Sequence, residues 1–352
     1  MACVDARGHQ DGDPAGWQVG RRRHRPVVNR RATVVVVTAP DDATADPVVM
    51  QLCERGVDVV RFDTAEFPAG ATLAASLTGG GWGGALRVGT RTIDLAGVRS
   101  VWWRRPGEFR LPSDWTETAR TFAASEARAG LLGVLGSLPV RWINHPTANL
   151  ATNYKPMQLA VAATLGLDPP ATVVTTDPTH AAMFARAHGA AGREVIYKAL
   201  GGGVHTAQRT ATIPTTVVDS GSMDESIAST AVLLQERVPK AYEVRLTVVG
   251  PRMFAVAIHA HSDETRLDFR VDYGALTYRS LPVPKKVAAG VSALMAHFGL
   301  FFGALDFAVT PDGRWRFFEI NASGQYRWLE RQLPGLGITD ALVDALSEGI
   351  TH

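Results

Sequence analysis

Short apolar runs alternate with amphipathic stretches along most of this chain, which is the pattern of an α/β protein. Residues 32–38 (ATVVVVT) are mostly β-branched, as expected of a strand that is buried on both faces of a sheet. The pattern then predicts a helix over 45–55 and a second strand over 57–62. This β-α-β beginning predicts an open α/β sheet. A dinucleotide site is not indicated, because no G-x-G-x-x-G sequence follows the first strand.

The remaining pattern predicts how the chain is divided. Residues 72–101 are strand-like, a long helix capped by Ser113 covers 113–137, and a strand over 141–145 ends before Pro146, where we place a domain boundary. The later predicted elements are helices over 155–165, 178–188 and 284–298, strands over 169–176, 194–200 and 231–238, a hairpin over 242–249 and 253–259, and two helical stretches at the end. The predicted domains are 32–140, 141–231 and 232–352, after a tail over 1–31.

A second hairpin is predicted near the end of the chain, where apolar runs flank the turn residues 311–313. If the turn is centred on Asp312 and Gly313, Asp306 faces Glu319 and Phe307 faces Phe318. A three-residue loop with a bulge would instead shift this register by one. An edge hairpin with its charges in water is the other open interpretation, although the neighbouring residues are apolar enough for a core.

The facing carboxylates of Asp306 and Glu319 predict a cation site. Like charges directly opposite each other destabilise a sheet, and a bound cation removes that penalty. Asn321 lies two residues beyond Glu319 and therefore projects from the same face. Carboxylate and amide oxygens suit magnesium better than zinc, and magnesium commonly accompanies phosphates.

Four basic residues are candidates for binding anions. Lys155 begins a predicted helix, and Lys198 in an apolar strand is followed directly by the glycines 201–203. Each lysine is weak evidence by itself for a phosphate site. Arg104 and Arg105 follow two tryptophans at a strand end and could receive carboxylates or phosphates, or could simply be solvated.

The overall composition is ordinary for a soluble protein. The chain has 352 residues, of which 46% are hydrophobic and 20% charged, with a net charge of +2. No apolar run approaches the ~18 residues of a membrane span. Its two cysteines, Cys3 and Cys53, form no disulfide framework, so we expect a cytoplasmic location and no membrane partner.

The first 31 residues carry seven Arg and three Asp, a balance of 7 − 3 = +4, and few large apolar side chains. We expect this basic tail to be disordered and solvated. It could bind an anionic partner, but without interleaved aromatic residues we do not expect nucleic acid.

The order and spacing of the candidate residues over about 140–330 resembles the ATP-grasp ligases. The resemblance implies that Lys155 and Lys198 contact the phosphates of ATP and that Glu243 holds the ribose. It also implies a backbone-mediated adenine site and a magnesium site that holds two ions. The adenine-binding residues would be Gln235, Glu236 and Val238, and the magnesium ligands would be Asp306, Glu319 and Asn321.

Within that superfamily, residues 319–330 (EINASGQYRWLE) resemble the EINPxGQWxWLE run of the graspetide synthetases, the ATP-grasp enzymes that macrocyclise ribosomal peptides. Residues 101–106, 153–159 and 166–172 are similar too, which extends the resemblance over roughly 32–350. Ala322 and Tyr326 depart from the family pattern, which puts the fit of the substrate in doubt more than the chemistry. Asp268 and Arg270 match a D-x-R element that engages the peptide.

The resemblance implies an ATP-grasp fold, an α/β protein with an α+β lid and an N-terminal open α/β pre-grasp domain. It implies that ATP activates Asp or Glu side chains of a precursor peptide, leader plus core, as acyl phosphates. Ser, Thr or Lys side chains of the same peptide then close ω-ester or ω-amide rings. Arg245 and Arg270 would steady the substrate carboxylate and the developing phosphate, and Arg104 and Arg105 would bind substrate. A homodimer is left open.

Two other classes of function stay open at this point. A glutamate-ligase or dipeptide-ligase type of enzyme would use the same ATP site with a different acceptor. A degenerate, non-catalytic peptide-binding protein is the other class. It would have no reason to retain the two lysines and the three metal-binding residues, so the sequence favours an enzyme.

Overall fold

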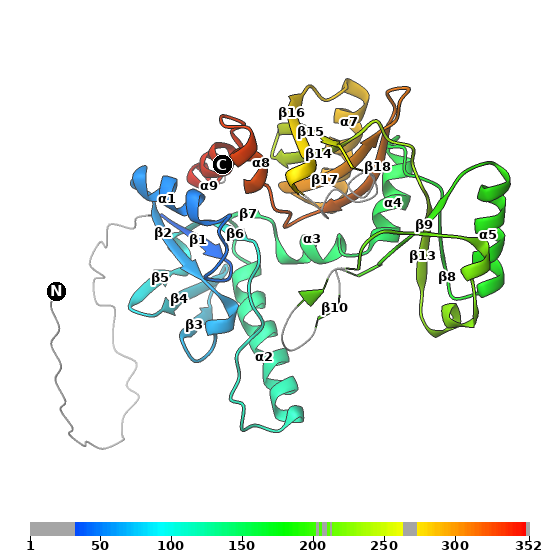
Figure 1. The fold of residues 1–352 in the computed structure, drawn as a ribbon. Coiled ribbons are helices and arrows are strands. Elements are labelled where there is room, and N and C mark those ends of the chain that lie inside the picture. Colours follow the sequence, from blue (N-terminus) through cyan, green and yellow to red (C-terminus); the bar gives the residue numbers. More distant parts are fainter. Residues whose placement is uncertain (1–31, 202–203, 206–209, 212, 263–272, 350–352) are drawn as a thin grey trace, which may run out of the picture. The chain divides into compact units, whose positions relative to one another are not determined.

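The computed structural model describes residues 32–349 except 202–203, 206–209, 212 and 263–272, and Figure 1 shows the fold. Residues 31–352 form one compact unit. Helices of the described residues are all too short or too polar to cross a membrane. Short 3₁₀ turns at 64–66, 95–97, 220–222, 225–229 and 273–275 connect several of the elements.

The N-terminal part contains the predicted open sheet. Its four strands are parallel and run in the order β2-β1-β6-β7. These strands are β1 (Thr33–Val37), β2 (Asp58–Phe62), β6 (Val98–Trp103) and β7 (Arg141–Ile143). Val34 and Val36 pack against helices α1 (Asp46–Glu54) and α9 (Ile338–Glu348). Val35 and Val37 pack on the other face, against helix α2 (Glu117–Gly136) and the antiparallel strands β3 (Ala71–Leu77), β4 (Trp82–Val88) and β5 (Arg91–Asp94).

Helix α2 begins later than the sequence predicts. Thr116, and not Ser113, is its N-cap, and the Thr116 side chain accepts a hydrogen bond from the backbone N–H of Ala119 at 3.2 Å. Both residues are good caps by type, so the sequence alone could not separate them.

The central part is an antiparallel sheet in the order β12-β9-β13-β8, covered by helix α5 (Pro178–Ala190). Its strands are β8 (Thr172–Thr175), β9 (Val195–Lys198), β12 (Thr216–Val218) and β13 (Val232–Glu236). Strands β10 (Val204–His205) and β11 (Thr210–Ala211) form a separate pair. Strand β13, which begins at Val232, thus completes the sheet of the central part.

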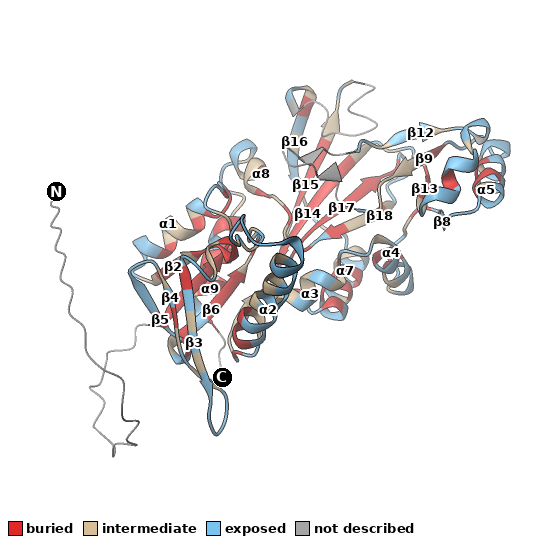
Figure 2. Cartoon of the chain, turned by 90° about the horizontal axis from the view of Figure 1, so that it is seen from below, coloured by how far each residue is buried: buried red, intermediate tan, exposed pale blue. Residues whose placement is uncertain are grey.

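The C-terminal part is an antiparallel five-stranded sheet in the order β16-β15-β14-β17-β18. Its strands are β14 (Tyr242–Val249), β15 (Arg252–Ala260), β16 (Leu276–Leu281), β17 (Phe302–Val309) and β18 (Trp315–Asn321). Alternate residues such as Leu246 and Leu305 pack with helices α4 (Lys155–Thr164) and α7 (Lys285–Phe298). Helices α3 (Pro146–Ala151) and α8 (Arg327–Gln332) are short. Figure 2 shows the buried residues along β14 and β17, and the other face of these strands carries polar side chains.

The register of the β17–β18 hairpin combines a correct and an incorrect prediction. Asp306 faces Glu319 as predicted, but Phe307 faces Phe317 and not Phe318. A three-residue loop closed by the pair Thr310 and Arg314 shifts the register by one near the turn. A bulge at Phe318 then takes up the extra residue and restores the Asp306–Glu319 pair.

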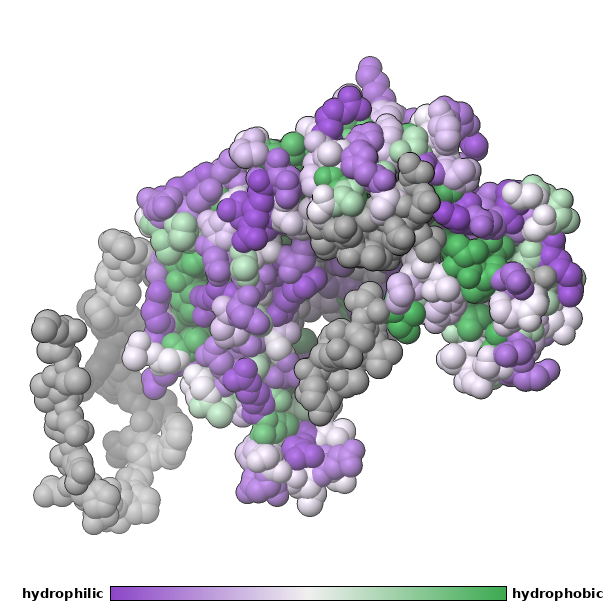
Figure 3. Space-filling model, viewed as in Figure 1, coloured by the Kyte–Doolittle hydropathy of each residue, from purple (hydrophilic) through white to green (hydrophobic). Residues whose placement is uncertain are grey.

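The visible face in Figure 3 is mostly hydrophilic, with hydrophobic residues in small separate groups. Large exposed hydrophobic side chains, such as Phe122 and Met183, are distributed over several elements. Scattered residues of this kind are normal on a protein surface and indicate no docking site.

Candidate nucleotide and metal site

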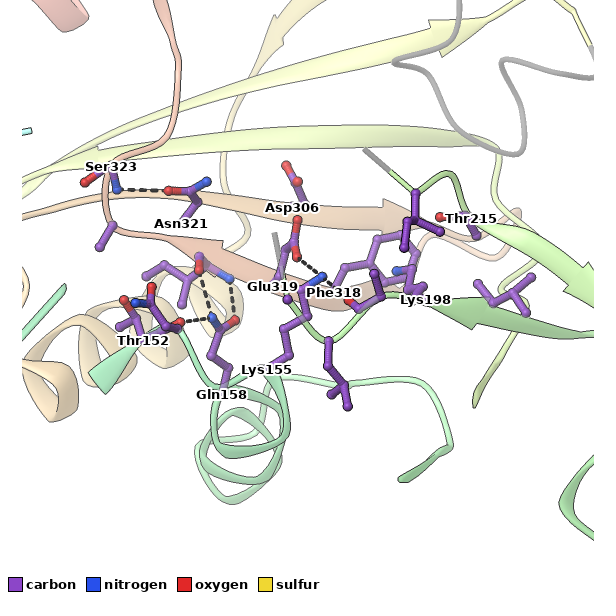
Figure 4. A pocket seen from close by; sticks show the side chains of 18 of the residues that line it. Thr152, Lys155, Gln158, Lys198, Thr215, Asp306, Phe318, Glu319, Asn321 and Ser323 are labelled. Atoms are coloured by element: carbon purple, nitrogen blue, oxygen red, sulfur yellow. Dashed lines mark hydrogen bonds and ion pairs between the residues drawn. The ribbon is translucent and has the colours of Figure 1, made fainter. Parts of the chain in front are cut away.

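A cavity of about 760 Å³ opens where the elements of the central and C-terminal parts meet. Figure 4 shows its polar side chains. The lining comes from α3 and α4, from β9 and the loop after it, from the segment between β13 and β14, and from β17 and β18. The sequence-predicted residues Lys155, Lys198, Val238, Glu243, Asp306, Glu319, Asn321 and Arg105 all line it.

The two facing carboxylates lie on the floor of this cavity, and each already has a cationic neighbour. Arg245 Nε lies 2.7 Å from Asp306 Oδ1, as an ion pair without hydrogen-bond alignment. Lys155 Nζ lies 3.4 Å from Glu319 Oε2. Strand pairing explains the first contact, because Arg245 is directly opposite Asp306 on β14. The basic side chains thus relieve the repulsion that the sequence predicted for the two acids.

The donor set suits magnesium. Among the described residues, no three His, Cys, Asp or Glu side chains gather as a metal cluster. The predicted trio instead combines the carboxylates of Asp306 and Glu319 with the amide of Asn321, whose Oδ1 accepts a hydrogen bond from Ser323 N at 2.9 Å. Magnesium typically takes only one or two protein carboxylates and completes its octahedron with water and phosphate oxygens. The residues therefore fit a magnesium ion that is shared with a phosphate ligand.

The two lysines approach the cavity from different elements. Lys155 is the first residue of α4, and its ammonium group donates a hydrogen bond to the Ala199 carbonyl at 2.8 Å. Lys198 Nζ lies 4.2 Å from the centre of the Phe318 ring. Burial lowers the pKa of Lys198, Glu319 opposes that effect, and the neighbouring Lys155 adds to it. A polyphosphate would stabilise the charged form of Lys198.

The predicted adenine and ribose positions differ in how they reach the cavity. Val238 and Glu243 line it, and Glu243 forms an ion pair with Lys240. The side chains of Gln235 and Glu236 are engaged elsewhere. Gln235 Nε2 donates to Thr172 Oγ1 at 2.9 Å, and Glu236 pairs with Arg193 at 3.2 Å and Arg316 at 3.5 Å. Gln235 Oε1, by contrast, has no hydrogen-bond partner among the described residues. Neither Gln235 nor Glu236 lines the cavity.

Arg104 and Arg105 have different environments although they are adjacent. Arg104 is buried, with Nε 2.6 Å from Asp42 Oδ2 and Nη2 2.7 Å from Gln325 Oε1. Burial alone would raise the pKa of Asp42. Arg104 and hydrogen bonds from Thr38, Arg104 and Thr44 outweigh this effect and hold the pKa below its usual value. Arg105 instead lines the cavity and donates to the Ser323 carbonyl at 3.3 Å.

A second cavity of about 470 Å³ shares Arg105, Asp306, Glu319 and Asn321 with the first. Its other walls include Arg245 and residues of α8 such as Arg327, Trp328 and Arg331. Four arginines and two carboxylates therefore give its lining a net positive charge, which suits an acidic ligand. Asp268 and Arg270, which the sequence assigns to the peptide substrate, lie outside the described residues.

Sequence reasoning missed several residues that line the main cavity, and three of them show where a signal existed and where it did not. Lys240 stands three residues before Glu243, and that spacing was a usable signal. Gln158, a buried amide three residues after Lys155 in an apolar helix, was another. Phe318 gave no such signal, because only the bulge places it in the cavity beside Lys198.

Comparisons with known proteins bear on the fold and the family of this chain. The pre-ATP-grasp domain of MvdD matches residues 33–149. The macrocyclase MdnC from Microcystis aeruginosa MRC, solved with its precursor peptide MdnA, is 31% identical, with 89% of this chain and 99% of that chain covered and a TM-score of 0.76. The macrocyclase MdnB from the same organism is 27% identical, with 89% and 98% covered and a TM-score of 0.72.

A RiPP-associated ATP-grasp ligase from Chryseobacterium gregarium, solved with ADP and a leader and core peptide, is 24% identical, with 90% and 96% covered and a TM-score of 0.80; this likeness supports the fold. No curated protein sequence matches. The predicted ATP-grasp fold with an N-terminal pre-grasp domain is confirmed. The identity to MdnC over nearly its whole length shows that this chain belongs to the ATP-grasp ligases that mature ribosomal peptides.

Proposed function

We propose that this ligase uses ATP to activate Asp or Glu side chains of a ribosomal precursor peptide and closes ω-ester or ω-amide macrocycles with Ser, Thr or Lys side chains of that peptide. The observation that carries the proposal is the meeting of two lysines and two facing carboxylates in one cavity: Lys155, Lys198, Asp306 and Glu319. Cations for phosphates and oxygen ligands for magnesium are the equipment of phosphoryl transfer.

Different residues of the cavity bind different parts of ATP. Lys155 and Lys198 neutralise the phosphates, Glu243 holds the ribose, and the backbone of the strand end that contains Gln235, Glu236 and Val238 meets the adenine. Asp306, Glu319 and Asn321 hold magnesium, two ions in this proposal, which supplies charge neutralisation at the phosphates when bound. The carboxylate of Glu243 can accept hydrogen bonds from a ribose while it is paired with Lys240, since a carboxylate has about four lone-pair sites.

The second cavity is suited to the carboxylate that is activated. Arg105 and Arg245 border both that cavity and the acid pair, so they can hold an acidic side chain next to the terminal phosphate of ATP. Asp268 and Arg270 would engage the peptide. Arg104 supports the site through Gln325 and Asp42, and its burial argues against a direct substrate contact.

The reaction then needs positioning and charge neutralisation more than protein nucleophiles. Phosphoryl transfer to the carboxylate gives an acyl phosphate and ADP. Attack by the hydroxyl or amine of the peptide gives the ester or amide and releases phosphate, while a proton leaves the nucleophile. The peptide supplies both reacting groups, so neither cysteine of the chain is required. The proposal includes assembly of the protein into a homodimer.

Replacing Glu319 by Gln tests the metal role. We expect ADP release with the precursor peptide at limiting magnesium to fall by about 10-fold or more, since an oxygen ligand loses its charge. Glu348→Gln, an exposed change on α9, is the matched control and should leave the rate unchanged. Near-normal turnover of Glu319→Gln at limiting magnesium would contradict the assignment of this residue.

A further inference from the structure

The side-chain amide of Gln158 bridges helix α4 and strand β18. Gln158 is 3% exposed. Its Nε2 donates to the carbonyls of Thr152 at 2.5 Å and Ile320 at 2.9 Å, and its Oε1 accepts from Ile320 N at 2.8 Å. Figure 4 shows these hydrogen bonds beside the cavity. The amide therefore satisfies both backbone groups of one residue, as a neighbouring strand would.

The position of Ile320 gives this contact its importance. In the described part of the chain, β18 is the outer strand of its sheet, with β17 on one side. Ile320 lies between Glu319 and Asn321, whose side chains project to the opposite face from its own. Fixing both polar groups of Ile320 fixes the backbone on which the two ligands stand. Without that contact, this end of an outer strand would have greater freedom to shift.

Gln158 also sets the distance between the strand and Lys155. The two residues are three positions apart on α4, so they lie on the same side of the helix. Lys155 Nζ reaches Glu319 Oε2 at 3.4 Å from that side. One amide thus holds in register a lysine that faces the phosphates and the oxygen ligands that face the metal.

We propose that Gln158 is a positioning residue that holds Glu319 and Asn321 in place for magnesium. This inference rests on the proposed function and extends it to a residue that does not itself reach the metal. Residues that orient metal ligands typically change metal affinity by 10- to 100-fold when they are replaced. Loss of Gln158 should therefore raise the magnesium requirement of nucleotide binding, and should do so without any peptide present.

The test uses Gln158→Met, which keeps the length of the side chain and removes its hydrogen bonds. Binding of a fluorescent ADP analogue is titrated against magnesium, and the melting temperature of each variant is measured. We expect the magnesium concentration for half-maximal binding to rise about 10- to 100-fold. Gln158→Leu also removes these hydrogen bonds and serves as the test variant if Gln158→Met does not fold.

Leu159→Ala is the matched control for general destabilisation. Leu159 is the next residue of α4, is 8% exposed and packs in the apolar cluster that also contains Ile320, but it makes no hydrogen bond to the backbone of that residue through its side chain. An unchanged magnesium requirement in Gln158→Met would overturn this inference and leave the proposed function intact. An equal rise in Leu159→Ala at a similar loss of melting temperature would also overturn it. If the wild-type protein shows no magnesium-dependent nucleotide binding, the proposed function itself fails and takes the inference with it.

Discussion

The buried ion pair of Asp42 and Arg104 offers a sharp test of how a buried charge pair stabilises the N-terminal part of the chain. The side chains are 4% and 1% exposed, and Asp42 also accepts hydrogen bonds from Thr38 Oγ1 at 2.8 Å and Thr44 N at 3.2 Å. Asp42→Asn keeps the shape of the side chain and removes its charge. The guanidinium of Arg104 is then left in the interior without a counter-charge.

The expected loss is large because both side chains are almost fully buried. Breaking one partner of a buried ion pair costs about 3–5 kcal/mol of unfolding free energy, against a total of about 5–15 kcal/mol for a typical protein. With about 2.1 cal/mol/K of unfolding entropy per residue, that loss lowers the melting temperature of a chain of this size by about 4–7 °C.

The dependence on pH has a defined sign. The folded chain lowers the pKa of Asp42, so its contribution is complete above the unfolded value of about 3.9 and disappears as the pH falls through the lower folded value. The difference between wild type and Asp42→Asn should therefore be constant near neutral pH and shrink in acid.

Thermal and urea unfolding measure the loss, with Asp46→Asn as the control. Asp46 pairs with Arg61 at 2.7 Å, but its side chain is 56% exposed, so the change should cost less than about 1 kcal/mol. The reasoning is refuted if Asp42→Asn is also within about 1 kcal/mol of wild type. Asp42→Leu combined with Arg104→Met should recover part of the loss, because no charge is then buried alone.

Two further predictions follow from the tail and from Lys198. A chain that starts at Arg31 should keep its melting temperature and its activity, since the composition of residues 1–31 cannot form a core; a large loss of either would show that the tail contributes to the fold or to the substrate site. Burial lowers the pKa of Lys198 in the folded chain. Between this lowered pKa and the unfolded pKa of about 10.4, the unfolded chain binds more protons than the folded chain, so stability should rise with pH across this window. Melting curves up to about pH 10 should show a weaker rise in Lys198→Met, and an equal rise would contradict the burial argument.

The sequence predicted those features that depend on local pattern. The β-branched run 32–38 forms the buried strand β1, and the apolar runs around the turn 311–313 form the β17–β18 hairpin. The facing acids Asp306 and Glu319 were predicted with a turn that was wrong by one residue. The alternative with a three-residue loop predicted the shift, but not the bulge at Phe318 that compensates for it.

Features that depend on distant partners could not be predicted in the same way. The sequence predicts the same role for Arg104 and Arg105. In the structure, however, Arg104 contacts Asp42, 62 residues away, and Gln325, 221 residues away. Gln325 follows Gly324. A Cβ atom at position 324 would lie 2.4 Å from the Cβ atom of Ala304, so only glycine allows the loop to pass this close to Ala304. Such contacts are decided by tertiary packing, which periodicity does not encode.

Mass spectrometry of the candidate precursor peptide tests the central claim most directly. The peptide is incubated with the enzyme, ATP and magnesium, with the Glu319→Gln variant and a reaction without ATP as controls. Macrocyclisation predicts mass losses in whole multiples of one water, about 18 Da per bond, without any free amino acid being consumed. A gain equal to a glutamate residue, or an unchanged mass while ADP is released, would contradict the account.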